Sequence, residues 1–113
     1  MAAARAVSRR VGAVWAQAVS VLAAVVTYAA VAVAIVLVLH IALVLLDANG
    51  ANSIVVFVRR LADRLVGPFQ GLFTPKDPKQ QVAINYGLAA AVYLAAGAAV
   101  ARGIRLLGGR FVR

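Results

Sequence analysis

The sequence contains no cysteine and no glutamate, and it has only three acidic residues, all aspartates, compared with twelve basic residues. Without cysteine, neither a disulfide framework nor a thiolate metal site is possible. The single histidine, His40, cannot supply a metal coordination shell alone, so a neutral imidazole bonded to a carbonyl or water is favoured. No nucleophile–base pair, paired carboxylates or phosphate-binding loop occurs. The sequence therefore predicts neither an enzyme nor a bound cofactor or metal.

Two long runs carry no formal charge, and they dominate the chain. They cover residues 11–46 and 82–101, within a sequence that is 65% hydrophobic with a mean hydropathy of +0.95. A helix needs about 20 apolar residues to cross a bilayer core of ~30 Å. The first run is much longer than the ~7–15 apolar residues of a secretory signal, so an uncleaved anchor is expected. These runs predict an integral membrane protein.

The basic residues gather at the ends of these runs. A net charge of +9 could indicate nucleic acid, but no aromatic residues interleave with the arginines, so nucleic-acid binding is not expected. Basic residues at helix ends anchor them and attract anionic headgroups. Seven basic residues lie in the two tails and five lie between the runs. That bias predicts cytoplasmic termini and a location in the cell (inner) membrane.

The fold class that follows is an all-α membrane protein: a two-transmembrane-helix hairpin with an amphipathic interfacial helix in its connecting loop. Residues 1–20 are expected to form a mobile basic tail followed by a segment that lies at the interface or extends the helix. The first spanning helix is predicted over residues 21–46, the loop over 47–81, and the second spanning helix with its basic end over 82–107. Residues 108–113 form a basic C-terminal tail.

The loop contains an amphipathic helix, predicted over residues 53–66. Its apolar residues recur at offsets of three and four, with arginines opposite them. Ser53 is expected to cap its start, and Gly67-Pro68 to end it. The predicted lipid or partner contact combines the apolar face with the neighbouring basic side chains: Ile54, Phe57, Val58, Arg59, Arg60, Leu61, Arg64 and Leu65.

Small residues recur every four positions in the second apolar run. Lipid gives no hydrophobic drive for helices to associate, so close backbone approach matters. A helix contact, within the hairpin or between copies, is therefore predicted at Gly87, Ala91, Ala95 and Ala99. A similar stripe in the first run consists of Ala23, Thr27, Ala30 and Ala34.

The polar residues of the second run have structural interpretations. Tyr86 is expected at the loop-side interface, and Asn85 is expected to cap the helix or reach water. Tyr93 lies deepest and is expected to bond to Thr27 or Tyr28. These residues do not form the continuous polar stripe that a pore needs.

Several short segments carry a family resemblance. They are Ala48-Asn49-Gly50-Ala51-Asn52, Phe57-Val58, Leu61-Ala62-Asp63 and Gly67-Pro68-Phe69-Gln70-Gly71-Leu72-Phe73. With the order of helices, they make the chain similar to the YggT family of small bacterial membrane proteins. The resemblance implies a two-span fold and a role in envelope organisation, assembly of membrane complexes or osmotic response. It implies no catalytic residue.

The function predicted from these features is that of a non-enzymatic accessory or scaffold factor of the cell envelope. Its expected partners are membrane lipids with anionic headgroups, and a homo-oligomer or a larger membrane complex. Two alternatives stay open: a holin-like pore former, and an accessory subunit of a respiratory or transport complex.

Overall fold

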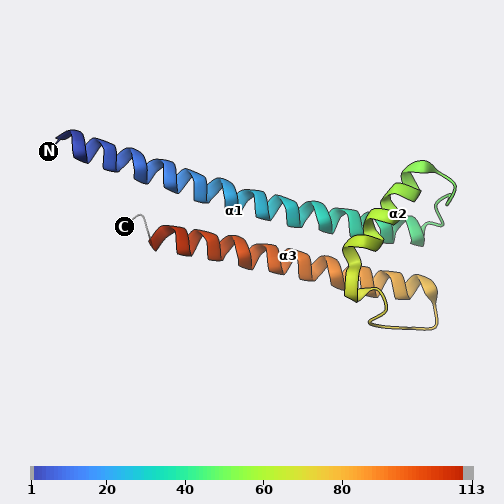
Figure 1. Cartoon of the computed structure of the whole chain (residues 1–113). Helices are drawn as coiled ribbons and strands as arrows, with labels where there is room; N and C mark the ends of the chain where they lie inside the picture. The colour runs from blue at the N-terminus through green and yellow to red at the C-terminus, as the bar shows by residue number, and fades with distance from the viewer. Residues whose placement is uncertain (1, 111–113) are drawn as a thin grey trace.

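Two long antiparallel helices form a hairpin, and a short helix crosses its loop end (Figure 1). The computed structural model describes the backbone of residues 2–110 and the side chains of residues 2–108. Within that range the elements are α1 (Ala2–Leu45), α2 (Ser53–Val66), the 3-10 helix η1 (Gly67–Phe69) and α3 (Pro78–Arg110), without a strand. The all-helical prediction is confirmed for these residues, and α1 and α3 are both long and apolar enough to cross a membrane.

Both long helices begin earlier than expected. α1 starts at Ala2, so the predicted mobile tail is wrong for residues 2–10, which are helical, whereas residues 11–20 extend the helix, which was one of the two expectations for them. That segment is rich in alanine, a strong helix former, and contains no proline. α3 starts at Pro78, where proline suits the first helical turn, and the Asp77 carboxylate accepts a hydrogen bond from the Lys79 amide at 3.0 Å. Met1 and residues 111–113 of the predicted C-terminal tail lie outside the described residues.

Three glycines of α3 mark how the two helices align. Gly87 lies against Ile41, Gly97 against Ala30, and Gly108 against Val19. At the open end of the hairpin, the indole Nε1 of Trp15 donates a hydrogen bond to the Gly108 carbonyl at 2.9 Å. The helices therefore stay in contact over most of a molecule 71 Å long.

The small residues of α1 lie in this contact, as predicted. Ala23, Ala30 and Ala34 are buried and Thr27 is half-buried. Leu37 and His40 continue the buried face toward the loop.

Within the hairpin, the predicted contact on α3 is wrong for Ala91, Ala95 and Ala99, whereas Gly87 does lie against Ile41 of α1. Ala91, Ala95 and Ala99 are exposed and Gly87 is half-buried. A step of four residues advances about 40° beyond a full turn, so a run of such steps soon leaves one face. The face that meets α1 advances in steps of four and seven residues, and its buried members are Tyr86, Ala90, Gly97, Ala101 and Gly108. A contact between copies through the predicted stripe stays a prediction.

The reversals around α2 satisfy helix ends locally. α1 ends at Leu45, and Asp47 follows in the left-handed region (φ 52°). The amides of Asp47 and Ala48 donate to the carbonyls of Val44 and Leu43. The cap of α2 is Asn52, not Ser53, because the Asn52 side chain accepts from the amides of Ile54 and Val55. Gly67 (φ 51°) follows the last helical residue, as expected.

Candidate functional site

α2 packs on the hairpin through a narrow apolar face. Val58, Ala62 and Val66 are buried, and the last two belong to a core cluster. The buried hairpin members of that cluster come from both long helices: Ala34, Leu37, Tyr86, Ala89 and Ala90. The polar residues around this crossing are called here the loop-end cluster, and they comprise His40, Asp63, Asn85, Tyr86 and Tyr93.

Two tyrosines of α3 hold α2 on the hairpin by hydrogen bonds. The Tyr86 hydroxyl donates to Asp63 Oδ1 at 2.6 Å, and the Tyr93 hydroxyl donates to the Leu65 carbonyl at 2.7 Å. Leu65 lies in the last turn of α2, where carbonyls lack a helical partner, so Tyr93 satisfies one of them. The expected bond from Tyr93 to α1 is therefore wrong. Thr27 instead donates to the Ala23 carbonyl within α1, and Tyr28 is 74% exposed.

Asn85 holds the segment that follows η1. Its side chain is fully buried, so the expectation that it caps a helix or reaches water is wrong. Its Nδ2 donates to the carbonyls of Gln70 (2.9 Å) and Phe73 (2.8 Å), and its Oδ1 accepts from the Phe73 amide (2.9 Å). One amide side chain thus replaces three main-chain partners that this irregular segment lacks.

His40 packs beside Tyr86 and borders a small pocket. The two rings lie 4.7 Å apart at 45°, and His40 is 6% exposed. With Asp47 and Arg59, His40 lines a pocket of about 190 Å³ between α1, the following turn and α2. Among the described residues, no three histidine or acidic side chains approach closely enough to hold a metal ion.

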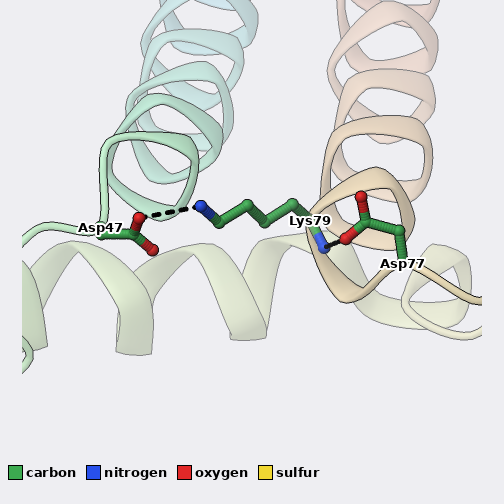
Figure 2. A network of polar contacts seen from close by, with 3 residues as sticks. All are labelled: Asp47, Asp77 and Lys79. Atoms are coloured by element: carbon green, nitrogen blue, oxygen red, sulfur yellow. Dashed lines mark hydrogen bonds and ion pairs between the residues drawn. The ribbon is translucent and has the colours of Figure 1, made fainter.

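An exposed ion pair ties the loop ends of α1 and α3. Figure 2 shows Lys79 between Asp47 and Asp77, with its Nζ 2.9 Å from Asp47 Oδ2 and its backbone amide on Asp77. The Lys79 and Asp47 side chains are 42% and 77% exposed, so the pair contributes at most about 1 kcal/mol.

This packing divides the residues of the predicted lipid or partner contact into a group that faces the hairpin and a group that stays exposed. Val58 is buried against the hairpin, and Leu61 and Leu65 are half-buried. Ile54 and Phe57 are 70% and 65% exposed. The exposed basic side chains around them are Arg59, Arg60 and Arg64.

The sequence pattern predicted neither the hydrogen bond that Asp63 accepts from Tyr86 nor the hydrogen bonds by which Asn85 holds the segment after η1. The available signal was the occurrence of Asn85, Tyr86 and Tyr93 within an apolar run, since polar groups buried there need partners. Their partners lie in α2 and the following turn, and the sequence pattern carries no information on that pairing.

Removing the Tyr86 hydroxyl is expected to loosen α2. Tyr86→Phe deletes a hydrogen bond to a carboxylate, a class worth about 1.5–3 kcal/mol. Asp63 is exposed, so water solvates its carboxylate once the bond is lost, and the loss should lie at the lower end of this energy range. That loss corresponds to a roughly tenfold larger population of molecules in which α2 is detached from the hairpin. The measurement is the labelling rate of Val66→Cys, whose position is buried when α2 is packed.

The matched control is Tyr28→Phe, at an exposed tyrosine of α1. Equal labelling rates in the Tyr86→Phe and Tyr28→Phe backgrounds would show that the Tyr86–Asp63 bond does not hold α2.

No protein-family model matches the chain, and no curated protein or solved structure shows significant similarity to it.

Proposed function

We propose that the chain is a non-enzymatic integral membrane protein of the bacterial inner membrane, which acts as an accessory or scaffold factor in the envelope. Its working surface is the outer side of α2. The observation that carries this proposal is that α2 is fastened across the loop end while Ile54 and Phe57 stay exposed beside three arginines.

The spacing of polar groups along α3 supports a membrane-spanning hairpin. α2 crosses near Tyr86, and the next charges along α3 are Arg102 and Arg105. From Tyr86 to Arg105 a helix rises about 28 Å, close to the ~30 Å of a bilayer core. Many large apolar side chains between these levels are exposed, among them Val92, Leu94 and Val100. Lipid would cover them.

The outer side of α2 suits an anionic membrane surface. Ile54 and Phe57 are large side chains that water solvates poorly. Arg59, Arg60 and Arg64 would each contribute on the order of 1 kcal/mol near anionic headgroups. If the chain is an accessory subunit of a larger complex, the same surface would bind a neighbouring subunit. The likeness of residues 67–73 to the YggT family agrees with a role in envelope organisation.

A holin-like pore has less support from the hairpin. The contact between α1 and α3 consists largely of alanine and glycine. Among the described residues, the buried polar side chains are His40 and Asn85, both near the loop end. A water-filled path along the hairpin would need polar side chains over its whole length.

Contact of α2 with lipid is tested on the full chain in vesicles. The absence of native cysteine allows a single fluorophore at Phe57→Cys, with Gly50→Cys in the open loop as control. Lipids brominated in the acyl chain are expected to quench the Phe57 label more strongly than the Gly50 label. Anionic lipid should increase that difference, and replacing Arg59, Arg60 and Arg64 with glutamine should abolish the increase. Equal, weak quenching at both positions would refute the membrane-surface role.

The proposed orientation places both termini in the cytoplasm. Ser8→Cys and Ser53→Cys are expected to react with a membrane-impermeant thiol reagent from opposite sides, because they lie at opposite ends of the hairpin. Labelling of Ser8→Cys from outside intact cells would reverse the orientation.

A further inference from the structure

The face of α1 turned away from α3 carries a regular apolar stripe. Its members recur in alternate steps of four and three residues, and the first six are Val7, Val11, Val14, Ala18, Val21 and Val25. All six are exposed. The same alternation continues through Tyr28 and Ile35 to Leu39. This spacing, a mean of 3.5 residues, is typical of a helix that packs along another helix.

The stripe is separate from the hairpin contact. The buried residues Ala23, Ala30 and Leu37 face α3, whereas Val7, Val14 and Val21 are 60%, 66% and 55% exposed. Within the described part of the chain, α2 packs at the loop end of α1, and it leaves Ile35 and Leu39 of the stripe 59% and 44% exposed.

One open apolar groove lies along this stripe, and a second lies between the loop-side part of the stripe and α3. One of about 350 Å³ is lined by Arg10, Val11, Val14, Trp15 and Ala18. The other, of about 480 Å³, borders the stripe at Ile35 and Leu39, and its remaining lining residues are Val31, Ala34, Val38 and Ala42 of α1 and Leu94 of α3. Side chains of a facing helix insert into such hollows when two helices pack with this period.

We propose that the stripe binds a second copy of this chain, with the two α1 helices parallel. The inference rests on the proposed membrane insertion, which gives both copies the same direction. Identical stripes then meet in register, as in a parallel coiled coil.

Part of the stripe lies where lipid cannot cover it. Gly108 is level with Val19 and the helices are antiparallel, so Arg105 is level with about residue 22 of α1, on the loop side of Val19. In the proposed membrane placement, α1 from Ala2 to about Val19 extends past the headgroups into water. Val7, Val11 and Val14 are exposed there, and a protein surface is needed to bury them.

The charges agree with a symmetric contact. Between Val11 and Leu39, α1 carries no formal charge. Arg5 and Arg9 lie on other faces of the helix, and only Arg10 flanks the stripe. Two such stripes meet without burying a charge, and salt should strengthen the contact by screening the paired Arg10 side chains.

The area is sufficient for a specific but modest interface. From Val7 to Leu39 a helix rises about 48 Å, and a helix is about 10 Å wide, so pairing would cover roughly 1,000 Å² over both copies. That value is at the minimum of ~1,000 Å² for a biological interface and below the ~1,200 Å² at which stable interfaces begin. The part in water gains hydrophobic free energy, and the part in lipid gains close packing.

A cysteine scan of the full chain in membranes tests the proposal, since the chain has no native cysteine. Under oxidation, Val11→Cys, Val14→Cys and Val21→Cys are expected to form disulfide-linked dimers. The controls Ala13→Cys, Ala16→Cys and Ser20→Cys are exposed but lie off the stripe, and they should stay monomeric. Uniform cross-linking at all six positions, or none at any of them, would overturn the proposal.

A second pair of variants does not depend on oxidation. In mild detergent, Val14→Lys is expected to halve the protein mass of the particle, because a dimer of this variant would bury two ammonium groups. Ala16→Lys should leave the protein mass unchanged. An unchanged mass with Val14→Lys would overturn the α1 contact. Resistance to carbonate extraction, measured on the same preparations, tests membrane insertion separately. Inserted protein without patterned cross-links refutes the dimer alone, and extracted protein refutes the proposed membrane function.

Discussion

Gly97→Ala is expected to destabilise the contact between α1 and α3 although alanine is the better helix former. A Cβ at Gly97 would overlap the Cβ of Ala30 and approach the main chain of α1. Ala30 has no flexible side chain to move aside, so the two helix backbones must separate. Overpacking of this kind costs about 1–3 kcal/mol. Unfolding of the full chain in detergent, followed by the fluorescence of Trp15, which bonds to Gly108 across the hairpin, measures the loss.

Gly103→Ala is the matched control within the same helix. Nothing lies within 4 Å of a Cβ at Gly103, so this variant should be neutral or more stable by up to about 1 kcal/mol. Equal stability of the two alanine variants would show that the approach at Gly97 is not close.

A compensating variant separates overlap from other causes. Ala30→Gly removes the methyl group that Gly97→Ala would meet, so the double variant should recover most of the lost stability. Stability losses that simply add would contradict the direct contact.

Asn85→Leu is expected to release the turn between η1 and α3. Leucine has a similar size but leaves the Phe73 amide and two carbonyls without the partners that Asn85 supplies. An unsatisfied buried polar group costs about 1–3 kcal/mol. The Phe73 amide should therefore exchange hydrogen roughly tenfold faster or more, measured by hydrogen exchange on the reconstituted full chain.

Gln80→Leu is the control for Asn85→Leu, because it removes a nearby amide side chain that is exposed. It should leave exchange at Phe73 unchanged. Asn85→Asp keeps the acceptor for the Phe73 amide but directs an oxygen at two carbonyls, so it should be about as disruptive as leucine. Normal exchange in both Asn85 variants would show that the turn holds without this side chain.

The sequence by itself determined the elements of the fold. The two uncharged runs require long helices whatever their neighbours are, because apolar residues over that length suit few other structures. The reversals at Asp47 and Gly67 depend on local backbone preferences, and the Asn52 and Asp77 caps on side chains next to the helices they begin. The sequence prediction was wrong for the cap of α2, because Asn52 and Ser53 can both accept that hydrogen bond, and for the starts of α1 and α3, which lie before the uncharged runs.

Only the tertiary structure decided how the helices are rotated and what the polar residues bind. α1 and α3 are apolar on nearly every side, so hydrophobic periodicity does not indicate which face meets the partner. Gly97 rather than Ala95 enters the contact because the α3 face under α1 also contains Tyr86 and Tyr93, which must reach α2. Asn85 and Tyr93 found main-chain partners far along the chain, and such pairing exists only once the helices have packed.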